Sequence, residues 1–446
     1  MFFISLVILV SLFSSYLIQK KKIGLAKLVV IFNIMWIILS IILMVNLNNK
    51  MLVNFDLLYV YMSILVLIVS MNLGFFLFLP VESKTEAYNE YSSEEDMLSA
   101  RKFFFINLII FILLITILDK SIQYVLNGDL DAIRISMYYA KVGTESSLFS
   151  SGIETILVNW ILNGTILGIN IVVITSYFKK KCGLSLVLFS IFNGVVFAIL
   201  TGGRIMILKI IIIIFLSMFS INSYKVMRID HKKRDVFFKI KRNKLFDLLI
   251  LLVVLAIFIT IGRSTSDIVE IRNIFNIMSN YLVSPITYYP YLLDANINGM
   301  ILLRGGAFFG GIGELLDIVL KNIVNYDYIF PFQQLINETS TFLRINSDHY
   351  YNAFPTMLYY FYRDGRFLGI VLDSLLFSII TSHTYRAFKT KWSTKGESLY
   401  LLSLYLIVMG TLRWEPVMAN FWITLLSISF FTSNSFLKRL EKKKVF

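Results

Sequence analysis

Long apolar segments recur along the whole chain, and shorter polar segments that carry most of the charged residues separate them. A helix needs about 20 mostly apolar residues to cross the roughly 30 Å of hydrocarbon in a bilayer. About eleven segments approach this length, so the pattern predicts an all-α, polytopic membrane protein. The predicted spans are Met1–Ile18, Leu28–Val45, Leu57–Leu79, Phe103–Leu118, Ile153–Phe178, Leu184–Leu200, Ile205–Ile221, Leu245–Ile261, Phe367–Thr384, Leu399–Leu412 and Ala419–Phe436.

Two polar segments are long enough to form structures of their own. Residues 80–102 are rich in glutamate and predict a solvated cytoplasmic linker. Residues 262–366 form a longer connection, and long connections without internal structure are uncommon. An apolar stripe from Ile268 to Leu282 and the amphipathic stretch Glu314–Val324 predict surface helices within it. We therefore expect a single transmembrane domain, residues 1–446, with an extracytoplasmic loop subdomain at residues 262–366.

The lysines indicate how the chain is oriented, because short cytoplasmic loops carry an excess of basic residues. Threading the spans in order puts every lysine cluster on one side, with the amino terminus outside and the carboxyl terminus in the cytoplasm. Most of the net charge of +14 lies in these loops, so it does not indicate nucleic-acid binding. The first span lacks a preceding basic residue and predicts an uncleaved anchor. The cytoplasmic clusters are Lys20–Lys22, Lys179–Lys181, Lys225–Lys244, Arg386–Lys395 and Lys438–Lys444.

The outer side has few lysines but many arginines, which topology alone would not place there. The planar guanidinium binds phosphate bidentately, whereas lysine acts as a point charge. The pattern therefore predicts an outer site for a phosphate-bearing ligand. The outer arginines are Arg134, Arg204, Arg263, Arg272, Arg304, Arg344, Arg363, Arg366 and Arg413.

Several of these arginines lie beside glycines at the predicted membrane edge. Thr201-Gly202-Gly203-Arg204 joins two spans in a tight turn, for which glycine is suited. Gly262-Arg263-Ser264 ends a span, and Arg272 follows on the predicted surface helix. Arg304 precedes Gly305-Gly306, whose amides would suit an anion nest, although no nucleotide-binding P-loop pattern follows. The alternatives are arginines that reach for the interface, or ion pairs with nearby carboxylates.

The segment Asp348–Thr356 combines groups suited to acid–base chemistry. His349 is the single histidine predicted outside, and neutral imidazole accepts a proton from a sugar hydroxyl. Asp348 or Asp364 would orient it or act in its place. An aromatic belt at the membrane interface is the alternative explanation for the tyrosines. Predicted substrate contacts are Tyr350, Asn352 and Thr356, with Tyr359, Tyr360 and Phe361 stacking on sugar rings.

The remaining polar positions add less. Arg413-Trp414-Glu415-Pro416 predicts the last outer turn, with Arg413 either facing the same cavity or capping a simple turn. A lone outer histidine and scattered carboxylates do not predict a metal site, and one cysteine excludes an intramolecular disulfide. Lys209 and Asp373 are the main charges inside the spans. We expect both to lie away from the outer arginines.

The chain resembles the bacterial oligosaccharide repeat-unit polymerases, called Wzy or O-antigen polymerases, which share an overall plan with O-antigen ligases. The matching pieces are the Gly203-Arg204 turn, the large outer loop, and Asn352–Thr356 leading to Asp364-Gly365 and Gly369. The resemblance implies a GT-C-like glycosyltransferase of the bacterial cytoplasmic (inner) membrane that uses neither metal nor other cofactor.

The resemblance also implies the substrates and residue roles. The donor is a growing glycan on undecaprenyl pyrophosphate and the acceptor is one lipid-linked repeat unit. Membrane lipid and a chain-length regulator are further candidate partners. The departing pyrophosphate needs positive charge, and the acceptor hydroxyl needs a base. The implied catalytic residues are Arg204, Arg263, Arg272 and His349; the implied substrate-binding residues are Arg304, Arg344, Asp348, Tyr350, Asn352, Thr356, Asp364 and Arg413.

Three alternatives stay open. A ligase of the same plan would transfer finished glycan to another acceptor. A lipid-linked glycan flippase or secondary transporter would bury charged residues inside several spans. A non-catalytic assembly partner would show no reaction when purified.

Overall fold

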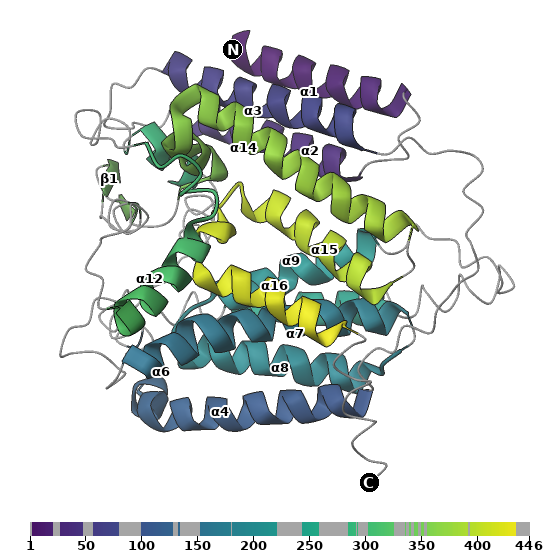
Figure 1. The fold of residues 1–446 in the computed structure, drawn as a ribbon, viewed down its shortest axis with the longest axis vertical. Coiled ribbons are helices and arrows are strands. Elements are labelled where there is room, and N and C mark those ends of the chain that lie inside the picture. The colour runs from purple at the N-terminus through teal and green to yellow at the C-terminus, as the bar shows by residue number, and fades with distance from the viewer. Residues whose placement is uncertain are drawn as a thin grey trace, which may run out of the picture. The chain divides into compact units, whose positions relative to one another are not determined.

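The fold is described from a computed structural model of the chain (Figure 1). Its described residues are 2–20, 27–47, 57–79, 100–127, 152–179, 181–220, 243–257, 284–290, 302–324, 343–346, 349–351, 355–390 and 393–433, with the single positions Ile133, Leu292, Leu335 and Thr339. All structural statements concern these residues. The predicted linker is described only from Ala100 onward, and the stripe from Ile268 to Leu282 lies outside the described residues.

The described residues are almost entirely helical, and each predicted span coincides with a helix. Four helices are long and apolar enough to cross a membrane: Leu58–Phe78, Arg101–Tyr124, Ile153–Phe178 and Met357–Lys389. The chain is therefore a helical membrane protein, and the finer prediction of eleven spans stays a prediction. The helices are α1 Phe2–Lys20, α2 Lys27–Leu47, α3 Leu57–Phe78, α4 Ala100–Leu126, α6 Gly152–Ile156, the π-helix η1 Leu157–Leu162, α7 Asn163–Phe178, α8 Leu184–Leu200, α9 Ile205–Ser220, residues 243–257, residues 284–290, α12 Gly310–Val324, α14 Met357–Thr390, α15 Thr394–Met409, the 3₁₀ helix η3 Glu415–Val417 and α16 Ala419–Phe431.

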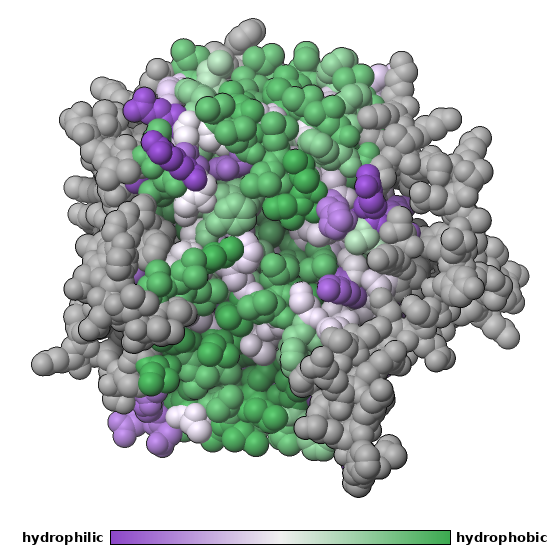
Figure 2. All heavy atoms as spheres, viewed as in Figure 1, coloured by the Kyte–Doolittle hydropathy of each residue, from purple (hydrophilic) through white to green (hydrophobic). Residues whose placement is uncertain are grey.

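Apolar side chains cover much of the helical surface, as lipid contact requires (Figure 2). Leu9, Leu12 and Phe13 of α1 are exposed, and so are Ile109 and Ile112 of α4. In Figure 2 the hydrophilic residues gather toward the two sides of the view rather than across its apolar middle.

The chain divides into two compact units, each described here by itself. The first comprises residues 1–89, 275–390 and 403–421, and the second comprises residues 90–274, 391–402 and 422–446. The boundaries pass through α15 and α16, so both helices contribute to each unit. The prediction of a single transmembrane domain stays a prediction.

In the first unit, α3 packs against α1, α2 and α14 (Figure 1). Asn33 and Asn72 exchange side-chain hydrogen bonds of 3.2 and 2.9 Å between α2 and α3, which satisfies two buried amides. Gly74 of α3 allows close approach to α14, because a Cβ there would lie 2.5 Å from Cβ of Ser378. Small residues of this kind let membrane helices pack tightly.

In the second unit, α8 packs against α4, α7 and α9. The amide of Asn193 on α8 donates to the backbone and side chain of Asn107 on α4, at 3.0 and 3.1 Å. Gly168 of α7 faces Ser427 of α16, where a Cβ would approach to 2.8 Å. Buried amides and small residues thus join the helices of this unit too.

A short hairpin is the one departure from the all-α prediction among the described residues. β1 Leu343–Asn346 pairs antiparallel with β2 His349–Tyr351, with Arg344 opposite Tyr350. The helical periodicity used for the apolar spans does not detect so short an element. The amphipathic stretch Glu314–Val324 does form a helix, because it lies inside α12.

Candidate functional site

The candidate site is built on a kink in α14. The helix departs from helical geometry at Gly365 (φ −171°) and Arg366 (φ 55°). The part after the kink, Phe367–Thr390, is about 36 Å long at 1.5 Å per residue, enough to cross a bilayer. Gly369 lies so close to Phe361 O across the kink that a Cβ there would overlap it. The kink therefore separates a spanning helix from a short helix that precedes it.

A strap of backbone, Leu303–Phe309, is hydrogen-bonded to this kink. The amide of Leu303 donates to Arg363 O at 3.0 Å, and the amide of Arg304 donates to Asp364 O at 3.1 Å. The Asp364 side chain binds the strap in return: Oδ1 accepts from Ala307 N and Oδ2 from Phe308 N, both at 2.8 Å. Gly305 N also donates to this carboxyl. The predicted amide nest therefore exists, and its anion is the chain's own aspartate.

Two arginines flank this junction and are exposed. Arg304 (φ 50°) and Arg366 (φ 55°) are the only non-glycine residues with positive φ among the described residues. This backbone region is unfavourable for residues with a Cβ, and such positions concentrate at functional sites. Arg304 is bonded to Asp364, two residues before Arg366, so both guanidiniums start from one rigid backbone junction.

The last predicted outer turn packs on the same junction. Trp414 Nε1 donates to Phe308 O at 3.3 Å, and its ring contacts those of Phe308, Phe361 and Phe377. Arg413 is nearly buried and forms an ion pair with Glu415, Nε to Oε1 3.6 Å. Arg413 thus belongs to the wall of the junction rather than to its exposed surface.

The structure brings together four predicted site residues: Arg304, Thr356, Asp364 and Arg413. Thr356 is buried just before α14, and its amide donates to Pro285 O at 3.4 Å. Asp364 binds the strap, and its predicted role in catalysis stays a prediction. Arg366, which the prediction counted among the outer arginines only, joins the site through the strap; the Arg-Asp-Gly-Arg sequence inside an apolar helix was the available signal.

Two expectations are wrong. Tyr359, Tyr360 and Phe361 do not offer faces to a sugar, because their exposed fractions are 0%, 1% and 0%. They pack inside the first unit because the kink turns this short helix into the core. Asp373 does not lie away from the outer cluster, since its carboxyl hydrogen-bonds that of Asp364. An uninterrupted helix would separate these positions by about 13 Å, and the kink removes that separation.

The other predicted residues are described separately or not at all. Arg204 belongs to the second unit, in a turn where Gly202 has φ 61° and Gly203 N donates to Ala198 O at 3.0 Å. His349 begins β2 opposite Asn346, and Arg344 and Tyr350 pair in the same hairpin. Four predicted residues lie outside the described residues: Arg263, Arg272, Asp348 and Asn352.

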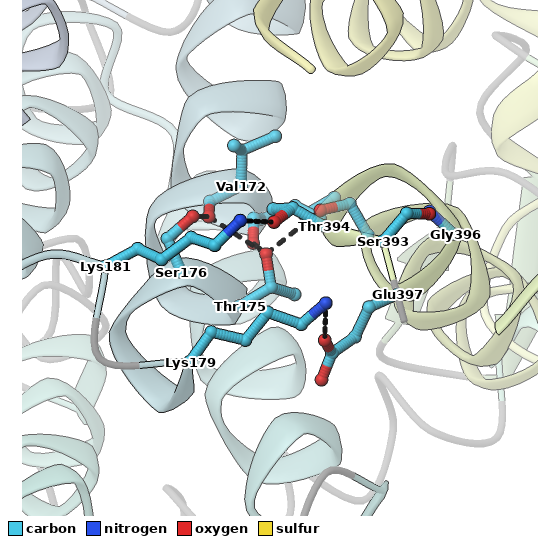
Figure 3. Close-up of polar contacts among 11 residues, drawn as sticks. Val172, Thr175, Ser176, Lys179, Lys181, Ser393, Thr394, Gly396 and Glu397 are labelled. Carbon is cyan, nitrogen blue, oxygen red and sulfur yellow. Dashed lines mark hydrogen bonds and ion pairs between the residues drawn. The ribbon is translucent and has the colours of Figure 1, made fainter. Parts of the chain in front are cut away.

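A second polar cluster lies in the second unit, at the predicted cytoplasmic ends of α7 and α15 (Figure 3). Lys179 and Glu397 form a 2.8 Å ion pair whose side chains are only 4% and 6% exposed. Burial raises the pKa of Glu397, and the Lys179 charge opposes this. Thr175 and Ser398 share a 2.9 Å hydrogen bond beside the pair. The cluster joins two helices and satisfies itself, so we assign it a structural role.

The described residues contain no group of three or more His, Cys, Asp or Glu placed to hold a metal ion. No protein-family model, curated protein or solved structure matches the chain. Its function is therefore argued from the junction of α14 and the strap.

Proposed function

We propose that this chain is a metal-independent, GT-C-like membrane glycosyltransferase. It polymerises undecaprenyl-pyrophosphate-linked repeat units on the outer face of the bacterial cytoplasmic membrane. The lipid holds such a substrate in the bilayer, with its diphosphate at the level of the headgroups. A site for it needs exposed cations fixed at the end of a spanning helix.

One observation carries the proposal: Arg304 and Arg366 are exposed on a rigid junction where the spanning part of α14 begins. Two guanidiniums suit a diphosphate, because each binds two phosphate oxygens in a fixed plane. Their backbone is held by the hydrogen bonds of Asp364, so little reorganisation accompanies charge development on the leaving group.

The reaction follows from these parts. The acceptor hydroxyl oxygen attacks the anomeric carbon of the donor sugar, the bond from that carbon to the pyrophosphate breaks, and undecaprenyl pyrophosphate leaves. A base takes the hydroxyl proton, a role we assign to His349. The arginines stabilise the negative charge that grows on the pyrophosphate, together with Arg204, Arg263 and Arg272 as the sequence predicts.

The test is direct. Purified protein is incubated with synthetic undecaprenyl-pyrophosphate repeat units, and the products are separated by size. Arg304→Gln and Arg366→Gln are expected to reduce the polymer ladder at least tenfold while single repeats persist. Arg386→Gln is the matched control, because Arg386 is exposed on the same helix at its other end. A wild-type ladder from both junction variants would refute the proposal.

A second candidate function is transport of a lipid-linked glycan. The observation that favours it is the burial of charged residues inside apolar helices, Lys209 on α9 (1% exposed) and Asp373 on α14 (7% exposed). Such residues are costly in a membrane and mark ion or substrate pathways. Movement of fluorescent lipid-linked repeat units across vesicles containing the protein, without change in their length, would support transport instead. A ligase would need the same junction and differs in its acceptor, so the same incubation with a non-lipid-linked acceptor identifies it.

A further inference from the structure

Asp373 is a buried acid that the proposed reaction does not use. It lies on the spanning part of α14, and its side chain hydrogen-bonds that of Asp364. Both residues are buried, at 7% and 6% exposed. An ionisable residue inside a spanning helix has a function by default, and Asp364 is the partner that the structure gives it.

The hydrogen bond fixes the state of the pair. Two carboxylates have only acceptor atoms, so a hydrogen bond between them requires one shared proton. Asp364 already accepts from the amides of Gly305, Ala307 and Phe308, which marks it as the ionised member. Asp373 is then the neutral donor. Its Oδ2 has no hydrogen-bond partner among the described residues, which is tolerable for a neutral carboxyl but costly for a buried carboxylate.

No cation replaces the proton in the described surroundings. Asp364 is the titratable group that interacts electrostatically with Asp373. The elements packed on α14 contribute three kinds of titratable or charged group. From α3 come Tyr59, bonded to the Tyr362 hydroxyl at 2.7 Å, and Tyr61; from the turn come Arg413 and Glu415, paired with each other; and from the strap comes the exposed Arg304.

We propose that Asp373 is a positioning residue. Its proton holds the Asp364 carboxylate in place, that carboxylate holds the strap, and the strap holds Arg304 beside Arg366. Loss of the proton would leave two buried anions in contact, whose repulsion would release the strap. The role in catalysis rests on the proposed function, whereas the link from Asp373 to the strap does not.

Asp373→Asn and Asp373→Leu separate this role from simple packing. The asparagine amide donates a hydrogen bond to Asp364 without needing a titratable proton, and leucine has a similar size but donates nothing. Asp317→Asn is the matched control, because Asp317 is another buried aspartate of the first unit, on α12.

Hydrogen–deuterium exchange of peptides covering residues 303–309, corrected for the intrinsic rate at each pH, measures the strap directly. Wild-type protein and Asp317→Asn are expected to lose protection at least tenfold at alkaline pH, and Asp373→Asn is expected to keep it. Asp373→Leu is expected to lose at least tenfold at all pH values. An alkaline loss in Asp373→Asn equal to that of wild type, or wild-type protection in Asp373→Leu, would overturn the proposal. If the leucine variant does not fold, the asparagine comparison decides alone.

Polymer formation measured over the same pH range distinguishes this inference from the proposed function. Asp373→Asn is expected to keep polymerising at alkaline pH where the wild type stops. Should the wild type make no polymer at any pH while strap protection follows the expected pattern, the proposed function fails and the positioning role stands. Parallel alkaline loss of activity in Asp373→Asn and wild type, with the strap protected only in the variant, would overturn the link to catalysis.

Discussion

The backbone amide of Arg304 donates to the carbonyl oxygen of Asp364 at 3.1 Å, which joins two segments far apart in the sequence into one junction. Arg304 and Arg366 both adopt left-handed backbone conformations there. Strain of this kind persists only where surrounding contacts determine the conformation, and here the carboxylate of Asp364 supplies them. The junction therefore trades stability for the placement of two exposed cations.

This trade predicts opposite effects of one substitution. Arg304→Gly should raise the free energy of unfolding by about 1 kcal/mol, because glycine adopts φ of 50° without a Cβ penalty. The same change should reduce polymer formation, since it removes a guanidinium. Reversible unfolding of the detergent-solubilised protein and the polymer ladder measure the two effects. Arg386→Gly in the regular part of α14 is the control and should lower stability by about 1 kcal/mol. A loss of stability in Arg304→Gly would show that the left-handed backbone there is not strained.

The two glycines of the kink should respond differently to alanine. At Gly369 a Cβ would overlap Phe361 O and approach the Asp364 carbonyl carbon at 3.1 Å, both rigid backbone atoms. Gly369→Ala should therefore cost about 1–3 kcal/mol of stability. Gly365→Ala is the matched control, because its Cβ would meet nothing within 4 Å and its φ of −171° is open to any residue. Equal stabilities of the two variants would contradict the close approach seen at Gly369.

The helices could be predicted from the sequence because an apolar segment of spanning length is a strong signal that needs no tertiary information. The segments at Leu184–Leu200 and Ile205–Ile221, for example, reappear as α8 and α9 with almost the same bounds. The kink could not be placed in this way. Its helix continues in sequence from Met357 to Thr390, and only contacts with the strap show where it breaks.

The candidate site was predictable in part, for the same reason. Arg304, Asp364 and Arg413 were found from residue type and local glycines, and the structure brings them to one junction. The role of Asp364 depends on amides supplied by a distant segment, and Asp373 reaches it only across the kink. Burial of Tyr359 and Tyr360 likewise depends on packing, which an aromatic-rich sequence does not distinguish from a sugar platform.

The indole hydrogen bond between the turn and the strap should contribute measurably to stability. Trp414→Phe keeps most of the ring contacts but removes the donor to Phe308 O, which leaves a backbone carbonyl without that partner. Trp36→Phe is the control, because Trp36 is fully buried and its Nε1 has no hydrogen-bond partner among the described residues. Trp414→Phe should be less stable than Trp36→Phe by about 1 kcal/mol or more in thermal or urea unfolding. The reverse order would exclude a stabilising role for the indole donor.

Breaking the buried ion pair of the second unit should cost far more than breaking an exposed one. Glu397→Gln leaves the Lys179 ammonium buried beside a neutral amide, and removing one partner of a buried pair typically costs about 3–5 kcal/mol. Lys120 and Glu154 are the internal control, because they form an ion pair of the same 2.8 Å length with side chains 36% and 38% exposed. Glu154→Gln should therefore change the free energy of unfolding by about 1 kcal/mol or less. Lys179→Met combined with Glu397→Gln should recover most of the loss, because no unpaired buried charge remains. Were the single and double variants equally unstable, the loss would come from packing at the ends of α7 and α15 rather than from the uncompensated charge.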